Sequence, residues 1–297
     1  NSKIYVMKTI VIIHNLNSRG KNINEDYVRE LLNKKGIKFH YFQTKQISDV
    51  DEIIKKYNNP SEFQYCSIGG DGSLNALVNS LMKNNITMPE VSCLPGGSGS
   101  DFIRTFALPQ NIEEAVEHLI FDNFYEVDVG LIKNKTDAKY FINVLNIGFL
   151  ASTVEVSEKF PNLFRAFRYP LSFWIKIITA RAKEMTISND KYEFKGMAFN
   201  ICVCNAQYFG GGWNISPKSS LQDGLFNIQV FAVTKLKAMQ IFFLAKKGLH
   251  LKESSVKLKR LSQLTVNSKD PIEIDGDFFG YGPAEIFIKK RAIRFKI

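Results

Sequence analysis

The sequence predicts two domains: an α/β domain built on a parallel sheet, then a β-rich domain built on an antiparallel sheet. Up to about Val127, short apolar runs alternate with helix-like segments. This alternation implies crossover connections between parallel strands. Beyond that point strand-like segments dominate. A length of 297 residues also suits two domains.

The first domain is expected to alternate buried strands with helices. The predicted strands are Thr9–Ile13, Lys38–Phe42, Tyr65–Ile68 and Val91–Leu94. The predicted helices are Asn24–Asn33, Ser48–Tyr57, Ser73–Met82 and Ile112–Phe121. In sheets of this kind, binding sites lie at the carboxyl ends of the strands. Three of these strands run directly into Gly, Ser, Asn or Asp.

The second domain is expected to carry an antiparallel sheet and two helical stretches. The predicted strands are Tyr140–Asn146, Met197–Asn205, Leu225–Ala232, Val256–Lys259, Gln263–Asn267 and Ile272–Ile274. The predicted helices are Phe164–Lys183 and Lys235–Gly248. We place the first domain at residues 1–127 and the second at 128–289, and we expect a last strand, Ala292–Ile297, to return residues 290–297 to the first domain.

Composition indicates a globular, cytoplasmic protein with a basic surface. Lys and Arg number 39 and Asp and Glu 29, a formal net charge of +10. The four cysteines and four histidines are scattered, which favours reduced core thiols over a zinc site. No apolar run reaches the ~18 residues of a membrane span, and Ile10–Ile13 is too short for the core of a signal peptide.

The sharpest motif is Gly69-Gly70-Asp71-Gly72-Ser73, which follows a predicted strand and opens a predicted helix. Glycines allow close approach to an anion, and N–H groups at a helix start attract phosphate. Asp71 would repel phosphate unless a cation lay between them, so it implies Mg²⁺. The alternative is a tight turn in which Asp71 caps the helix.

Two further loops follow neighbouring strands, so we expect three loops to converge on one phosphate site. They are Asn15 to Lys21, which includes Asn17 and Ser18, and Pro95 to Phe102, which includes Gly96, Gly97, Ser98 and Asp101. This convergence makes a plain turn at Asp71 less favoured. None of the loops is a Walker A loop, which needs Gly-Lys-Ser/Thr in register.

In this order the motifs resemble the diacylglycerol kinase catalytic domain family, which includes sphingosine kinases, ceramide kinases and soluble bacterial lipid kinases. The resemblance covers nearly the whole chain and implies an NAD kinase/diacylglycerol kinase-like fold. Gly69 to Ser73 is similar to the family's nucleotide loop, and Pro95 to Phe102 to its second loop, with Ser98 and Ser100 substituted. The second-domain residues that resemble family motifs are Phe141, Asn143, Gly148, Asn205, Gly210-Gly211-Gly212, Pro217, Asp223-Gly224 and Asp275-Gly276-Asp277.

The resemblance implies the cofactors ATP and Mg²⁺ and a role for each motif. Asp275 would be the general base, Asp71 would act beside it, and Asp71, Asp101 and Asp277 would hold the catalytic Mg²⁺. The residues that would bind the nucleotide are Asn15, Asn17, Ser18, Gly69, Gly70, Gly72, Ser73, Gly96, Gly97 and Ser98. On an extended strand Asp275 and Asp277 would point the same way; a hairpin turn is the alternative.

The sequence departs from the family pattern at several positions. Ala76 replaces a usual Glu, and Asp277 replaces the final Glu. Some bacterial relatives hold a structural Mg²⁺ at positions that correspond to Ser220, Asp223 and Leu225. Ser220 is a poorer ligand than a carboxylate, so a plain turn at Asp223-Gly224 is the alternative there.

Two basic stretches are candidates for docking on an anionic membrane. Phe160 to Lys183 interleaves aromatic and basic residues, and Thr234 to Arg260 carries eight Lys and Arg against the one acid Glu253. Basic residues contribute about 1 kcal/mol each near an anionic leaflet. The alternative is a helix whose aromatic residues pack inside the domain. No nucleic-acid-binding module is evident, and a homodimer is left open.

We therefore expect an ATP-dependent lipid kinase that is cytoplasmic and peripherally membrane-associated. Diacylglycerol, converted to phosphatidic acid, is the leading acceptor. Its pocket would lie in the second domain, with transfer in a cleft between the domains. The alternatives are a kinase for a sphingoid base or polyprenol, an NAD kinase-like enzyme, and a nucleotide or lipid sensor with weakened catalysis.

Overall fold

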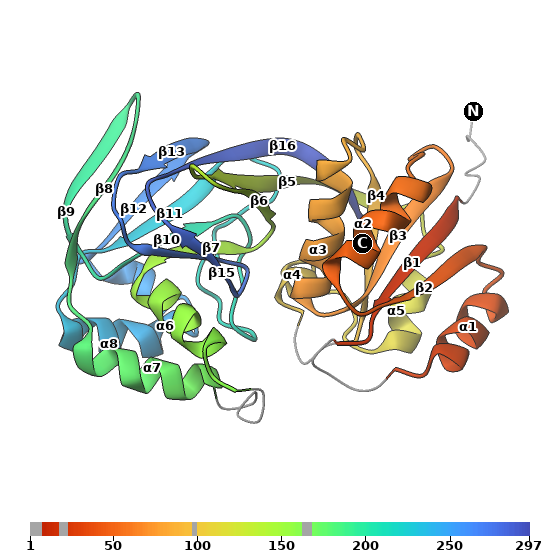
Figure 1. Cartoon of the computed structure of the whole chain (residues 1–297), viewed down its shortest axis with the longest axis horizontal. Helices are drawn as coiled ribbons and strands as arrows, with labels where there is room; N and C mark the ends of the chain where they lie inside the picture. Colours follow the sequence, from red (N-terminus) through yellow and green to blue (C-terminus); the bar gives the residue numbers. More distant parts are fainter. Residues whose placement is uncertain (1–7, 18–22, 97–99, 162–167) are drawn as a thin grey trace. The chain divides into compact units, whose positions relative to one another are not determined.

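The computed structural model describes residues 8–17, 23–96, 100–161 and 168–297 (Figure 1). The chain forms two compact units, one of Asn1–Val129 with Lys290–Ile297 and the other of Gly130–Lys289. The first is an α/β unit with a parallel sheet and the second is built on antiparallel strands, so the predicted fold class is confirmed. The boundary expected after residue 127 falls within β5 (Phe124–Lys133).

The parallel sheet of the first unit has the order β2-β1-β3-β4. Its strands are β1 (Thr9–Asn15), β2 (Phe39–Thr44), β3 (Phe63–Gly69) and β4 (Glu90–Pro95). The end of β16 (Ala284–Lys296) pairs in parallel with β4 through Arg294 and Phe295. The middle of β1 is buried at every residue, as expected of a strand with helices on both faces.

Helices cover both faces of this sheet. They are α1 (Glu25–Lys34), α2 (Ile47–Lys56), α3 (Asp71–Lys83), α4 (Asp101–Thr105) and α5 (Ile112–His118). Apolar residues of α1 and α5 share one core cluster with β1, β3 and β4, while α2 and α3 pack against each other (Figure 1). Asn24 starts α1 by accepting the N–H of Asp26, which satisfies an end donor of the helix.

The second unit is a β-sandwich. One sheet has the order β12-β11-β10-β7-β14-β15. Its strands are β7 (Val144–Gly148), β10 (Asn200–Cys204), β11 (Phe226–Phe231), β12 (Val256–Leu261), β14 (Pro271–Ile274) and β15 (Asp277–Tyr281). Facing it, β13 (Gln263–Val266) pairs with β16 and with β8 (Lys183–Asn189), and β8 pairs with β9 (Tyr192–Ala198). Ile147, Ile201, Ile187 and Val266 meet in the core between these layers.

Three helices pack on the outer face of the six-stranded sheet (Figure 1). They are α6 (Phe149–Glu158), α7 (Arg168–Thr179) and α8 (Lys235–Ala245), and the short 3₁₀ helix η2 (Leu249–Lys252) follows α8. Their core includes Ile177 of α7, Ile241 of α8 and Cys202 of β10. Among the described helices, none is both long and apolar enough to cross a bilayer.

The structure corrects several predicted elements. The strand expected at Tyr140–Asn146 is two strands, β6 (Ala138–Phe141) and β7, because the N–H groups of residues 142–144 turn to the carboxylate of Asp275. The strand expected at Met197–Asn205 is β9 and β10, which belong to different sheets. The helix expected to reach Lys183 ends at Thr179, and Lys183 is instead the first residue of β8, which forms a hairpin with β9. The elements missed altogether are β5, α4, α6, β8, η2 and β15.

Gly130 provides a test of the packing in the second unit. A Cβ at Gly130 would lie 2.3 Å from ring atoms of Phe141, its partner across β5 and β6, whereas a Cβ at Gly196 of β9 would stay 3.5 Å from Phe194. We expect Gly130→Ala to lower the free energy of unfolding by about 2–3 kcal/mol, as overpacking does. The control Gly196→Ala should change it by less than about 0.5 kcal/mol. Chemical denaturation measures both, and equal stabilities would contradict this packing.

Candidate active site

Hydrogen bonds join loops at the carboxyl edge of the parallel sheet. Asn15, at the end of β1, donates from Nδ2 to Oγ of Ser73 at 3.1 Å, and its Oδ1 accepts the N–H of Asn17 at 2.9 Å. The N–H of Gly96, after β4, donates to the carbonyl of Gly69 at 3.1 Å. The loops after β1, β3 and β4 thus meet at one place, as their order in the sheet requires.

Two glycines at this edge differ in the space available for a side chain. A Cβ at Gly96 would lie 2.7 Å from Cδ1 of Ile23 and 3.1 Å from the nitrogen of Gly69, so a side chain there would displace Ile23 and crowd the backbone of the neighbouring loop. A Cβ at Gly72 would meet no described atom within 4 Å. The described fold therefore does not require glycine at Gly72, whereas close approach of a ligand to the first turn of α3 would.

Asp71 ties the Gly-rich loop to the next helix. Its Oδ2 accepts the N–H of Asp101 at 2.8 Å and its Oδ1 accepts the N–H of Phe102 at 2.9 Å. Both donors lie in the first turn of α4, where N–H groups lack partners within the helix. Asp71 does cap a helix, but the helix is α4 and not the one that it begins. Asp101 itself is 4% exposed, and its carboxylate lies 3.8 Å from Nε of Arg104.

The residues at this edge suit a phosphate group and a divalent cation. The N-terminus of α3 offers N–H groups and the positive end of the helix dipole. Asp71 and Asp101 offer carboxylate oxygens, which Mg²⁺ prefers and commonly shares with substrate phosphates and water. No group of three or more His, Cys, Asp or Glu in the described ranges forms a ready-made metal cage. Ser18, Gly97 and Ser98 lie outside the described residues.

In the second unit, a cradle of backbone N–H groups holds the carboxylate of Asp275. Its Oδ2 accepts the N–H of Ile142 at 2.7 Å, and its Oδ1 accepts those of Asn143 at 2.9 Å and Val144 at 3.0 Å. The amide of Asn205 supports this segment by donating to the carbonyl of Ile142 at 2.9 Å. Three donors to one carboxylate stabilise its charged form and fix its orientation.

Asp275 and Asp277 do not lie together on an extended strand, and the structure shows the hairpin turn that the sequence left as the alternative. Asp275 and Gly276 have φ values of 50° and 93° and form the turn between β14 and β15. Positive φ at both central positions is typical of a tight hairpin, with glycine at the second. Asp277 begins β15, and its largely exposed carboxylate pairs with Nζ of Lys139 at 3.2 Å.

The predicted second metal site fits the structure poorly. Oδ1 of Asp223 accepts the N–H of Leu225 at 2.9 Å, and Oδ2 pairs with the guanidinium of Arg260. Ser220 accepts a long bond, 3.4 Å, from the N–H of Gln222. The positive charge beside this carboxylate is that of Arg260.

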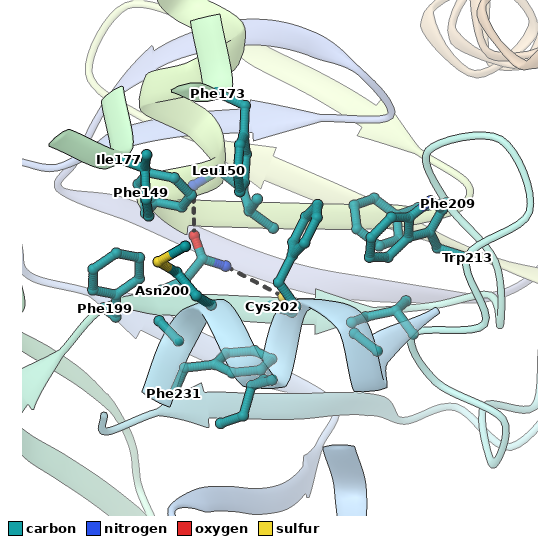
Figure 2. A pocket seen from close by; sticks show the side chains of 16 residues that line it. Phe149, Leu150, Phe173, Ile177, Phe199, Asn200, Cys202, Phe209, Trp213 and Phe231 are labelled. Carbon is teal, nitrogen blue, oxygen red and sulfur yellow. Dashed lines mark hydrogen bonds between the residues drawn. The ribbon is translucent and has the colours of Figure 1, made fainter. Parts of the chain in front are cut away.

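An apolar pocket lies between the six-stranded sheet and helices α6, α7 and α8 (Figure 2). The empty space inside it, its opening included, is about 530 Å³. Its walls are Phe149, Leu150, Phe173, Ile177, Phe199, Asn200, Cys202, Phe209, Trp213, Ile215, Phe231, Ala238, Met239, Ile241, Phe242 and Ala245. The one amide in this wall, Asn200, accepts the N–H of Leu150 at 3.0 Å and donates to Sγ of Cys202 at 3.3 Å.

Helices α7 and α8 also expose apolar side chains on their outer sides. Trp174 is 56% exposed, Ile178 74%, Leu236 81% and Phe243 69%. Basic residues of the same helices and their ends accompany them, namely Arg168, Lys176, Lys235, Lys237, Lys246 and Lys247. The sequence left two interpretations of the aromatic residues, packing inside the domain or docking on a membrane. The structure divides these residues between an inner and an outer side of the helices, since Phe173 is buried and its neighbour Trp174 is not. Phe164 and Phe167 lie outside the described residues.

Sequence reasoning placed an acceptor pocket in the second domain without identifying its walls, and it missed the cradle of Asp275. Part of the pocket comes from α6, which was not predicted, and part from Phe199 between two strands that were predicted as one. The cradle uses backbone N–H groups, which leave little trace in the sequence. The one available signal was the dense aromatic content of α7 and α8, which was assigned to docking or core.

Comparison with known protein families covers both units. Residues 9–132 match the model of the diacylglycerol kinase catalytic domain. Residues 143–296 match the model of the YegS C-terminal NAD kinase beta sandwich-like domain. The second match alone spans more than half of the chain.

Individual relatives agree with this assignment. The diacylglycerol kinase of Staphylococcus haemolyticus is 28% identical over 76% of this chain and 68% of its own length. That of Staphylococcus carnosus is 26% identical over 95% and 92%. Two solved structures from Bacillus anthracis str. Sterne share the fold, with TM-scores of 0.77 (23% identity, covering 100% of this chain and 97% of that chain) and 0.73 (18%, 98% and 96%). The chain therefore belongs to the diacylglycerol kinase catalytic domain family, with a YegS-type second domain, and is a kinase by that membership.

Proposed function

We propose that this chain is an ATP-dependent lipid kinase that transfers the γ-phosphoryl group to a lipid hydroxyl, with diacylglycerol as the leading acceptor. The named relatives are diacylglycerol kinases, which supports this acceptor at 26–28% identity. A sphingoid base or a polyprenol is the alternative within the same class.

The observation that carries the proposal is the apolar pocket of the second unit. Its walls are aliphatic and aromatic apart from Asn200 and the thiol of Cys202. An acyl chain gains about 0.8 kcal/mol for each CH₂ group that it buries in such walls. A dinucleotide acceptor would bring charged phosphates and polar sugars that these walls do not match, so the pocket favours a lipid over NAD.

The joined loops of the first unit would bind the nucleotide. The α3 N-terminus and the space beside Gly72 would receive phosphate oxygens, and Asp71 and Asp101 would hold Mg²⁺. When bound, the ion would offset the negative charge of the phosphates. Asp71 also keeps the first turn of α4 in place through its two bonds, so one residue serves both loop geometry and charge.

Asp275 would accept the proton of the acceptor hydroxyl as phosphoryl transfer proceeds. Its cradle keeps the carboxylate pointed in one direction. Asp277, which forms an ion pair with Lys139, would have to break this pair to bind the metal ion.

The outer sides of α7 and α8 would dock on an anionic membrane. Exposed apolar residues insert at the interface while basic residues attract anionic headgroups. These helices also form walls of the pocket, so the proposed docking surface and the pocket are two sides of the same helices.

A phosphate-transfer screen tests the proposed function. Radiolabelled ATP is supplied with Mg²⁺ and with diacylglycerol, a sphingoid base, a polyprenol or NAD in turn. We expect label in a lipid product and none in NAD. Label in NAD alone would make the chain an NAD kinase, and no label in any acceptor would favour a sensor.

Asp71→Asn should abolish detectable turnover, because it removes a carboxylate of the proposed metal site. The amide cannot accept both N–H groups of α4, so we also expect a loss of about 1 kcal/mol in the free energy of unfolding. The control is Asp49→Asn, which removes another carboxylate that accepts N–H groups at a helix start in the same unit. The control should keep its turnover. Near-wild-type kcat in Asp71→Asn would contradict the assignment of this loop.

Asp275→Asn should lower kcat by about 10²-fold or more, the scale for losing a general base. The amide presents a donor to at least one N–H of the cradle, so the free energy of unfolding should also fall, by roughly 1–3 kcal/mol. ATP affinity, measured by calorimetry, should change little because other loops bind the nucleotide. Turnover within a few-fold of wild type would show that Asp275 is not the base.

Binding to vesicles should require anionic lipid and fall with salt, since charges are screened over ~8 Å at physiological ionic strength. Replacing Lys246 and Lys247 with Glu should weaken it further. The matched control replaces Lys55 and Lys56 of α2 with Glu, which changes net charge equally, and should keep more of the binding. Equal sedimentation of all three proteins, or of neutral and anionic vesicles, would remove the support for docking by α8.

A further inference from the structure

Glu273 is a buried carboxylate to which the proposed reaction gives no role. It lies on β14, two residues before Asp275, and is 4% exposed. Its Oε1 accepts the N–H of Gly276 at 2.6 Å, and its Oε2 accepts Nδ2 of Asn146 at 2.7 Å. A buried carboxylate is costly unless donors satisfy it. These two short bonds therefore offset part of the cost and make its position specific.

A chain of hydrogen bonds fixes the orientation of the Asn146 amide, and the backbone N–H of Gly276 can only donate. The N–H of Leu150 can only donate, so it sets the amide of Asn200 with Oδ1 towards Leu150. Nδ2 of Asn200 then donates to Oδ1 of Asn146 at 3.2 Å, which leaves Nδ2 of Asn146 for Glu273. Glu273 thus faces a donor at each oxygen and works as an acceptor at both.

Burial raises the pKa of Glu273 to about 8, and the bonds from Asn146 and Gly276 oppose that rise. The charges of Asp275 and Asp277 add to it. Burying a carboxyl group here costs free energy of desolvation. An apolar residue at the same position of the β-strand would cost less, so packing alone does not require a carboxyl group. The buried carboxyl group of Glu273 therefore points to a role beyond packing.

The bond to Gly276 acts on the peptide that directly follows Asp275. That peptide is the centre of a turn in which both residues have positive φ. We propose that Glu273 is a positioning residue, which holds the peptide N–H between Asp275 and Gly276 and so keeps the carboxylate of Asp275 in its cradle. The inference rests on the proposed function, in which Asp275 accepts the proton of the acceptor.

Glu158 of α6 offers a matched control on the same hairpin. Its Oε1 accepts the N–H of Phe278, in β15, at 2.9 Å. Because this is a single N–H donor, the carbonyl of a glutamine can accept it equally well. At Glu273, by contrast, a glutamine must turn its NH₂ group towards either Gly276 or Asn146, and one bond becomes a contact between two donors.

The experiment compares Glu273→Gln, Asn146→Leu and Glu158→Gln, with diacylglycerol in mixed micelles as the acceptor. We expect Glu273→Gln to lower kcat about 10-fold, as misplacement of a catalytic group does, with KM for ATP and for lipid within about twofold of wild type. Asn146→Leu removes the second donor to Glu273 and should lower kcat about threefold with the same KM values. Glu158→Gln should match wild type.

A double-mutant cycle separates positioning from general destabilisation. In the Asp275→Asn background, Glu273→Gln should cause no further loss of kcat, because the group that it positions is already gone. An additive loss, or unchanged kcat in whichever of Glu273→Gln and Asn146→Leu folds, would overturn the inference. If Asp275→Asn itself keeps wild-type turnover, the proposed base fails instead, and the two failures are therefore distinct.

Discussion

Aspartate carboxylates that collect backbone N–H groups from distant parts of the chain are the interaction on which both candidate sites depend. Asp71 takes two N–H groups from the start of α4, and Asp275 takes three from residues 142–144. Charge-assisted bonds of this kind are about twice as strong as neutral ones. They satisfy backbone N–H groups that the buried side chains of these segments, Ile142, Val144 and Phe102 among them, cannot satisfy.

The same interaction explains why the chain departs from regular structure where it does. Residues 142 and 143 lie between β6 and β7 and leave the ladder, so the strand pairing is interrupted there. The carboxylate of Asp275, in the turn between β14 and β15, accepts the N–H groups that the strand ladder leaves without partners there. The buried acceptor Glu273 and the buried donor Asn205 support the two sides of this arrangement. The N–H groups of this irregular backbone are thus satisfied by side-chain oxygens, and its carbonyls by the Asn205 amide and by backbone N–H groups.

Much of the fold could be predicted from the sequence, because the buried strands of the first unit are short apolar runs between clear helix patterns. Ile10–Ile13 and the runs before Gly69 and Pro95 belong to this class. The second unit was harder, since its strands change sheets without a break in hydrophobicity, as at Phe199 between β9 and β10. For the site, glycine and aspartate motifs located the loops. Which N–H groups each carboxylate binds depends on tertiary contacts, 30 and 31 residues apart for Asp71 and 131 to 133 residues apart for Asp275, and no local pattern records them.

The two-sided character of α7 and α8 has a consequence for handling the protein. Their inner residues line the pocket and their outer residues, Trp174, Ile178, Leu236 and Phe243 among them, face solvent. The exposed apolar side chains make these helices adhesive towards detergent tails, column resins and each other. If the helices dock on a bilayer as proposed, an oligomer that forms in buffer alone through this surface would dissociate when lipid is supplied.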